Sequence, residues 1–259
     1  MLKELFTAAL GMQNQQTRLE VTTNNMANAS TAGFKRASVF ERNLIDAKAN
    51  FFNTPGDVEQ NDSPIGSYYS QEPGAYTMSG NKLDVAIEGK GFFVVEDSEN
   101  KKYLTRAGNF QLSTEGYIVT KDGHSLLGQN GPINLSEEFL SNSLVTNDKT
   151  AVNIRISENG EVFANDMEVG KILVANVQDD NTLQRVSGSN FFPTWESDVM
   201  YLQDEDFNIR QGWVEGSNVN IVQEMVTMIE LQRTFEAGSK VIQTNDGTLE
   251  RAIGLGRYY

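Results

Sequence analysis

Hydrophobic side chains recur every seven residues at both ends of the chain. The repeated positions, together with one companion position, are Leu5, Met12, Leu19, Met26, Met228, Leu231, Phe235, Ile242 and Leu249. Positions separated alternately by three and four residues lie on one face of a helix, as in helices that pack along their length. The pattern predicts a helix near each end, with these nine side chains as packing contacts. Two arrangements stay open: the helices pair with each other, or both lie on a common globular core.

The middle of the chain has the pattern of β-structure. Short runs rich in β-branched or aromatic residues predict strands at 83–87, 92–96, 103–106, 117–120 and 172–177. Glycines follow Glu115, Asp122, Asn130 and Asn159, where a positive φ favours tight turns. So many turn signals without a long helical stretch indicate an antiparallel sandwich or irregular barrel. Two polar segments, 141–150 and 178–190, are predicted to be loops.

Residues 41–80 separate the first helical pattern from the β pattern. Polar turn-forming residues dominate this segment, and prolines at positions 64 and 73 disfavour helix immediately before them. We therefore expect it to be extended.

The predicted fold class is α+β. Its segments are an N-terminal helical segment (1–40), an extended linker (41–80), a central all-β domain (81–210) and a C-terminal helical segment (211–259). Isolated helices with such narrow stripes are marginal in water, so the two terminal helices are expected to gain their stability from partners.

The charge of the chain excludes several classes of partner. Twenty-one Lys and Arg residues oppose 35 Asp and Glu residues, for a net charge of −14. A nucleic-acid-binding protein needs a basic surface to replace phosphate counterions, and docking on anionic lipid needs one too. The chain has no cysteine, which excludes disulfides, thiolate metal sites and a cysteine nucleophile.

The N-terminus does not have the pattern of a cleaved signal peptide. Lys3 and Glu4 interrupt the first apolar run, and residues 13–18 are too polar for the apolar region and small-residue cleavage site of a signal peptide. We expect either a cytoplasmic protein or one exported without cleavage.

Residues suited to catalysis are sparse. The single histidine, His124, follows a predicted turn, where a surface role is far more common than a catalytic one. The acidic pairs Glu137-Glu138 and Asp179-Asp180 are adjacent in predicted loops, so they rarely converge on one point. No zinc-protease, nucleophile-elbow or phosphate-loop motif occurs. We predict no catalytic site, no metal site, no cofactor and no small-molecule substrate.

Several stretches resemble the bacterial flagellar rod and hook protein family. Near the N-terminus these are Asn24-Asn25-Met26-Ala27-Asn28 and Thr31-Ala32-Gly33-Phe34-Lys35-Arg36. The middle contributes 83–93 and 103–110, and the C-terminal part contributes Ser217-Asn218-Val219-Asn220 followed by 224–236. The resemblance extends from end to end, with its motifs in the family's order.

This resemblance implies an axial structural protein, a proximal or distal subunit of the basal-body rod. It implies that the N- and C-terminal helices pair as an inner coiled-coil-like domain, with a β domain outside, and that there is no catalytic site or cofactor. The implied partners are further copies of the chain, other rod and hook proteins, and the flagellar type III export apparatus. The implied location is the periplasmic rod of the basal body, reached without a cleaved signal peptide.

The residues of these motifs also have local interpretations. The short amides of Asn24, Asn25 and Asn28 suit hydrogen bonds to backbone where the first helix ends. Gly33 supplies a conformation that leads into Phe34 as an apolar contact. Ser217 or Asn218 is expected to cap the second helix.

The function predicted from the sequence is that of a rod subunit that polymerises through its terminal helices and transmits torque from motor to hook. The alternatives are a hook or hook-associated axial protein and a secreted carbohydrate-binding β domain. The last would use exposed aromatic side chains, for which the candidates are Tyr68, Tyr69, Trp195 and Trp213.

Overall fold

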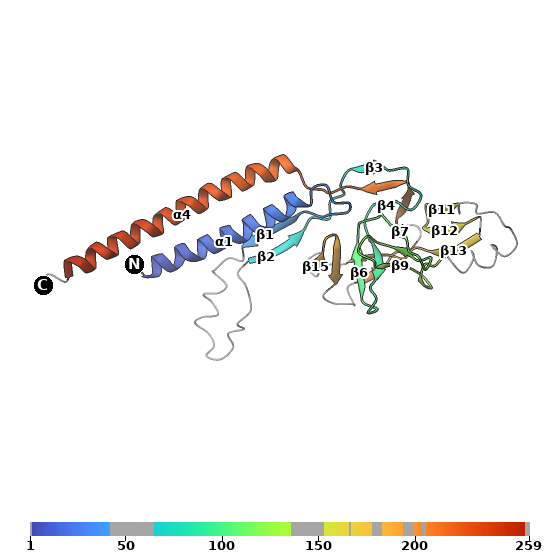
Figure 1. Ribbon diagram of the computed structural model, residues 1–259, viewed down its shortest axis with the longest axis horizontal. Coiled ribbons are helices and arrows are strands. Elements are labelled where there is room, and N and C mark those ends of the chain that lie inside the picture. Colours follow the sequence, from blue (N-terminus) through green and yellow to red (C-terminus); the bar gives the residue numbers. More distant parts are fainter. Residues whose placement is uncertain are drawn as a thin grey trace. The chain divides into compact units, whose positions relative to one another are not determined.

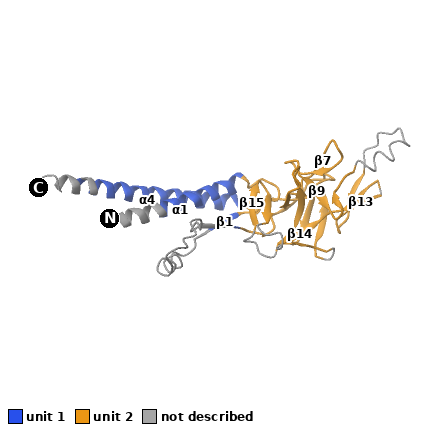
Figure 2. Cartoon of the chain, turned by 90° about the horizontal axis from the view of Figure 1, so that it is seen from below, with its two compact units in different colours: residues 1–27, 37–68, 220–259 blue, residues 28–36, 69–219 orange. Residues whose placement is uncertain are grey.

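A computed structural model describes residues 2–41, 65–135, 153–165, 167–177, 183–193, 199–203 and 206–256. The fold class is α+β, as predicted: a helix lies at each end and the middle is rich in strands (Figure 1). The chain forms two compact units (Figure 2). Unit 1 comprises 1–27, 37–68 and 220–259, and unit 2 comprises 28–36 and 69–219.

Unit 1 contains two long helices, α1 (Leu2–Ala27) and α4 (Ile221–Gly256). They lie side by side and antiparallel, because Met12 meets Gly238 and Asn25 meets Glu224 (Figure 1). Strands β1 (Ala37–Glu41) and β2 (Ile65–Tyr69) form a two-stranded sheet, and β1 packs against α1.

The first helix ends at Ala27, well before the end of the predicted segment 1–40. Residues 28–36 belong to unit 2, where Gly33 has a φ of +66°. That left-handed conformation cannot continue a right-handed helix. Most of the predicted linker, 42–64, lies outside the described residues, but β3 (Tyr76–Met78) shows that its last part contains a strand.

Unit 2 is built around a large antiparallel sheet with β5 (Phe92–Glu96) at its centre. One side of β5 pairs with β6, and the other side pairs with β14 through 92–93 and with β9 through 95–96. The sheet continues from β6 through β16 to β15, from β9 to β8, β7 and β10, and from β14 to β17. The bounds of these strands are β6 Lys102–Thr105, β7 Gln111–Leu112, β8 Ile118–Val119, β9 Ser125–Gly128, β10 Gly131–Pro132, β14 Val174–Val177, β15 Leu183–Ser187, β16 Asn190–Pro193 and β17 Val199–Tyr201.

Three smaller antiparallel sheets complete the described part of unit 2. Strand β3 pairs with β19 (Trp213–Glu215), and β4 (Val85–Glu88) pairs with β18 (Asn208–Gln211). The third sheet contains β11 (Ile154–Ile156), β12 (Glu161–Ala164) and β13 (Met167–Lys171).

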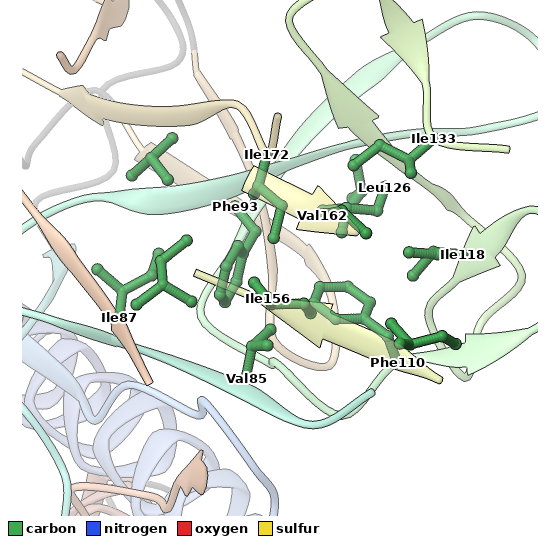
Figure 3. Close-up of a cluster of buried hydrophobic side chains, with 14 of the residues drawn as sticks. Val85, Ile87, Phe93, Phe110, Ile118, Leu126, Ile133, Ile156, Val162 and Ile172 are labelled. Carbon is green, nitrogen blue, oxygen red and sulfur yellow. The ribbon is translucent and has the colours of Figure 1, made fainter. Parts of the chain in front are cut away.

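Two clusters of buried side chains form the core of unit 2. The larger one combines β4, β5, β9, β11, β12 and β18, and Figure 3 shows Phe93 and Phe110 among its aliphatic members. These two rings meet edge to face, with centroids 5.3 Å apart. The smaller cluster lies around Phe92 and Phe191 on β5 and β16. Because side chains alternate along β5, Phe92 and Phe93 enter different clusters.

The five predicted strands all correspond to observed ones, and the four predicted turn glycines have positive φ angles. The predicted loop at 178–190 is wrong where it covers β15. Strand β15 has few apolar residues because, in the described part of the chain, it is the edge strand next to β16 and most of its side chains are exposed, with Leu183 buried. The predicted loop at 141–150 lies outside the described residues.

Candidate functional site

Six of the nine predicted seam positions are half-buried or buried. Leu231 is buried, while Met12, Leu19, Met26, Met228 and Ile242 are half-buried. Helices α1 and α4 approach closely at Gly238, where an added Cβ would lie 3.3 Å from Cγ of Met12. Phe235 remains 38% exposed. The side chains of Leu5 and Leu249 lie outside the described residues.

A second apolar surface on α4 was not identified by the heptad pattern. Val222, Met225, Val226 and Ile229 are 70%, 49%, 52% and 50% exposed, and we call them the open patch. Their spacing of three and four residues places them on one face, roughly opposite Leu231 at 100° per residue. Soluble monomers rarely leave such a contiguous apolar surface uncovered.

The open patch is confined to the first turns of α4. Further along the same face the exposed side chains include Arg233, Glu236 and Lys240, which are charged. The helix therefore presents a short apolar surface followed by a solvated one.

Polar side chains are buried where α1 ends and α4 begins. Asn25 is 1% exposed, and its Oδ1 accepts from the Ala37 N–H at 2.9 Å while its Nδ2 donates to the Ala37 carbonyl at 2.8 Å. The same Nδ2 donates to Oε2 of Glu224 at 3.4 Å. Asn25 thus joins α1, β1 and α4. Asn24 is exposed on α1.

In unit 2 the segment after α1 is held against the segment before α4. Asn28 occupies a turn, with its carbonyl accepting from the Thr31 N–H at 3.1 Å. The Gly33 N–H donates to the Glu215 carbonyl at 2.8 Å, and a Cβ on Gly33 would lie 2.2 Å from the Ala107 nitrogen. Only glycine fits there. Phe34 is fully buried, with the Arg185 guanidinium 4.1 Å above its ring.

The structure also contains a buried charge cluster that the sequence did not predict: Lys35, Arg106 and Glu215. Lys35 Nζ lies 2.7 Å from Oε1 of Glu215, and Arg106 Nη1 lies 3.2 Å from Oε2. Oε1 also accepts from the Gly74 N–H at 3.0 Å, and Lys35 Nζ donates to the Glu72 carbonyl at 2.9 Å. One carboxylate therefore pairs with two cations that water does not reach.

Burial shifts the pKa of the two cations and the pKa of the neighbouring Tyr76 phenol in opposite directions. It lowers the pKa of Lys35 and of Arg106, and the Glu215 carboxylate opposes that shift in both. Burial, with Glu215 adding to it, raises the pKa of Tyr76. Arg106 donates further to the carbonyls of Ile87 and Gly89, at 3.2 and 2.7 Å, so the cluster also holds the end of β4.

The predicted cap of the second helix is wrong. Asn220 caps α4, with its Oδ1 accepting from the N–H groups of Val222 and Gln223 at 3.1 and 3.3 Å. Asn218 instead accepts from the Arg36 N–H at 2.6 Å and donates to the carbonyls of 70 and 72 in unit 2. Ser217 Oγ accepts from the Val219 N–H.

The described residues contain no group of three His, Asp or Glu side chains placed to hold a metal ion. The His124 ring stacks on Tyr103 with centroids 5.2 Å apart, and its Nε2 lies 3.9 Å from Asp97. The acidic pairs 137–138 and 179–180, and Trp195, lie outside the described residues. Trp213 is half-buried on β19. None of the described helices is long and apolar enough to cross a membrane.

Three family models match successive parts of the chain. Residues 5–35 match the flagella basal body rod protein model, and 86–164 match the D1 domain of the flagellar hook protein FlgE/F/G. Residues 210–255 match the C-terminal model of the flagellar basal body rod FlgEFG protein.

Curated relatives match over nearly the full length. The flagellar basal-body rod protein FlgG of Borreliella burgdorferi is 31% identical, over 99% of this chain and 100% of the relative. FlgG of Caulobacter vibrioides is 32% identical, over 98% and 99%. The flagellar basal-body rod protein FlgF of Rhizobium meliloti is 27% identical, over 96% and 95%.

Proposed function

Because the chain belongs to the family of flagellar basal-body rod proteins, we propose that it polymerises into the rod through the helices of unit 1 and transmits torque there. The chain is a structural subunit of the basal body, in a family of structural proteins rather than enzymes. The observation that carries the proposed mode of polymerisation is the open patch on α4.

The open patch is suited to packing against a helix of a neighbouring subunit. Fully burying a Val, Ile or Met side chain contributes about 1.5–3 kcal/mol. Four such side chains, each half-exposed or more, leave ~3–6 kcal/mol of burial to be gained on contact. The seam around Leu231 is already covered by α1, so in this proposal one face of α4 closes the subunit in a coiled-coil-like pair and the other face joins subunits.

Torque transmission follows from this packing. Closely packed side chains have low compressibility and transmit strain. In this proposal the terminal helices α1 and α4 form the inner domain of the rod and the β domain lies outside. The proposed partners are further copies of the chain, other rod and hook proteins and the type III export apparatus, with export to the periplasmic rod without a cleaved signal peptide.

Charge placed in the open patch tests the proposal. Purified wild-type chain should form larger assemblies as its concentration rises in analytical ultracentrifugation, and Ile229→Asp should stay monomeric with unchanged circular dichroism. Gln243→Asp is the matched control, because it adds the same charge at an exposed position of α4 without removing apolar surface. If Ile229→Asp assembles like the wild type, the open patch is not the polymerisation surface.

A further inference from the structure

The apolar seam of unit 1 does not by itself determine how far α1 and α4 slide along each other. Its hydrophobic positions repeat every seven residues on both helices, so a shift of one helix by seven residues again places Leu, Met, Ile and Phe side chains on the facing sides, although it brings Asn245 rather than Gly238 opposite Met12. A repeated seam of this kind needs a different contact to select one register.

We infer that Asn25 is the specificity-determining residue that fixes the register of α1 against β1 and α4. Its side chain is buried and bonds both backbone groups of Ala37, and its amide also reaches Glu224, which is 1% exposed. These partners are 12 and 199 residues away in the chain. The contact is therefore tertiary and joins three separate elements.

The chemistry of the side chain accounts for this role. A carboxamide has one acceptor and two donor hydrogens, so it can serve an N–H and a C=O of one backbone residue while donating to a carboxylate. A slip of α1 by seven residues along α4 would take Asn25 away from Glu224. Buried polar groups without partners cost free energy, so the slipped pairing is disfavoured although its apolar contacts are similar. A single buried asparagine fixes register in coiled coils by the same physics.

Fixing the register has a consequence for the surface of the subunit. Glu224 lies between Val222 and Met225 in the sequence but on the opposite side of α4 from the open patch. The contact to Asn25 thus sets the position of the open patch along α1. The inference itself concerns one chain and is tested without polymerisation.

Engineered cysteine pairs measure the register, because the chain has no cysteine of its own. Met12→Cys with Gly238→Cys reports the native register, in which the two positions are in contact. Met12→Cys with Asn245→Cys reports a slip of seven residues. Mild oxidation of dilute full-length protein should form the first intrachain disulfide at least tenfold faster than the second. In an Asn25→Leu background this ratio should fall at least fivefold.

Two controls separate register from general damage. Asn24→Leu makes the same chemical change at the neighbouring exposed position and should leave the ratio unchanged. Glu224→Leu keeps both bonds between Asn25 and Ala37 and removes the contact of Asn25 to α4, so its ratio should fall by a smaller factor. Glu224→Leu replaces Asn25→Leu as the test variant if Asn25→Leu loses its helical circular dichroism. If Asn25→Leu or Glu224→Leu folds and keeps the wild-type ratio of the two disulfide rates, the inference is overturned. An equal fall of this ratio in Asn24→Leu would overturn it as well.

Discussion

Replacing Glu215 with glutamine should destabilise unit 2 more than any change to an exposed ion pair. Glutamine has almost the same shape as glutamate but has no charge, so Lys35 and Arg106 would remain as two buried cations without an anion. Both side chains are at most 3% exposed in this cluster. Removing one partner of a buried ion pair costs about 3–5 kcal/mol, because the remaining charge stays out of water.

A second ion pair in the same chain provides a control with the same geometry. Lys101 and Glu99 also lie 2.7 Å apart, but their side chains are 59% and 68% exposed. Solvent screens such a pair, and losing it costs about 0–1 kcal/mol. Distance alone would predict equal effects for Glu215→Gln and Glu99→Gln, whereas burial predicts a several-fold difference.

Urea denaturation measures this difference. Trp213 lies on β19 with Glu215, so its fluorescence reports on the surroundings of the cluster. With a slope of about 2 kcal/mol per molar urea, a loss of 3–5 kcal/mol lowers the midpoint by roughly 1.5–2.5 M. Glu99→Gln should move it by less than about 0.5 M. Equal midpoints for the two variants would refute the argument that burial determines the cost.

Three other changes have definite expected outcomes. Gly33→Ala should lower the free energy of unfolding by more than ~2 kcal/mol, because the added Cβ clashes with backbone and the residue has a left-handed φ. Gly80 has a φ of +73° but open space around it, so Gly80→Ala should cost about 1 kcal/mol. Similar urea midpoints for the two variants would contradict this expectation. Asn220→Ala should lower the stability of unit 1 by about 1 kcal/mol in thermal unfolding, and Ser217→Ala should not. Burial lowers the pKa of Lys35, so between that lowered value and 10.5 the unfolded chain binds more protons. The stability of the wild type relative to Lys35→Met should therefore rise with pH in this window, and a fall would show that the pKa is raised instead.

Local patterns in the sequence were sufficient for part of the secondary structure. The seven-residue repeat identified both helices, and β-branched runs between glycine turns identified five strands. These signals depend on residues a few positions apart. Strand β15 was missed because an edge strand with one solvent face has few of the apolar residues that mark a strand.

The contacts that carry the site are tertiary, and for that reason the sequence did not reveal them. Lys35 and Glu215 are 180 residues apart, and no pattern along the chain indicates that they meet. The motif Thr31–Arg36 was recognised and its lysine was not assigned a role. The cap of α4 was misassigned because 217–220 offers several suitable side chains, and the choice depends on Asn218 being used by Arg36 instead.

The central claim is that the open patch on α4 holds this subunit in the rod. The most direct measurement is the amount of the protein in basal bodies purified from cells that express Ile229→Asp or Gln243→Asp as the only copy. Our account predicts that Gln243→Asp is present in the rod at the wild-type amount and that Ile229→Asp is missing from it, although both are produced as folded chains. Rods that contain Ile229→Asp at the wild-type amount would contradict the account.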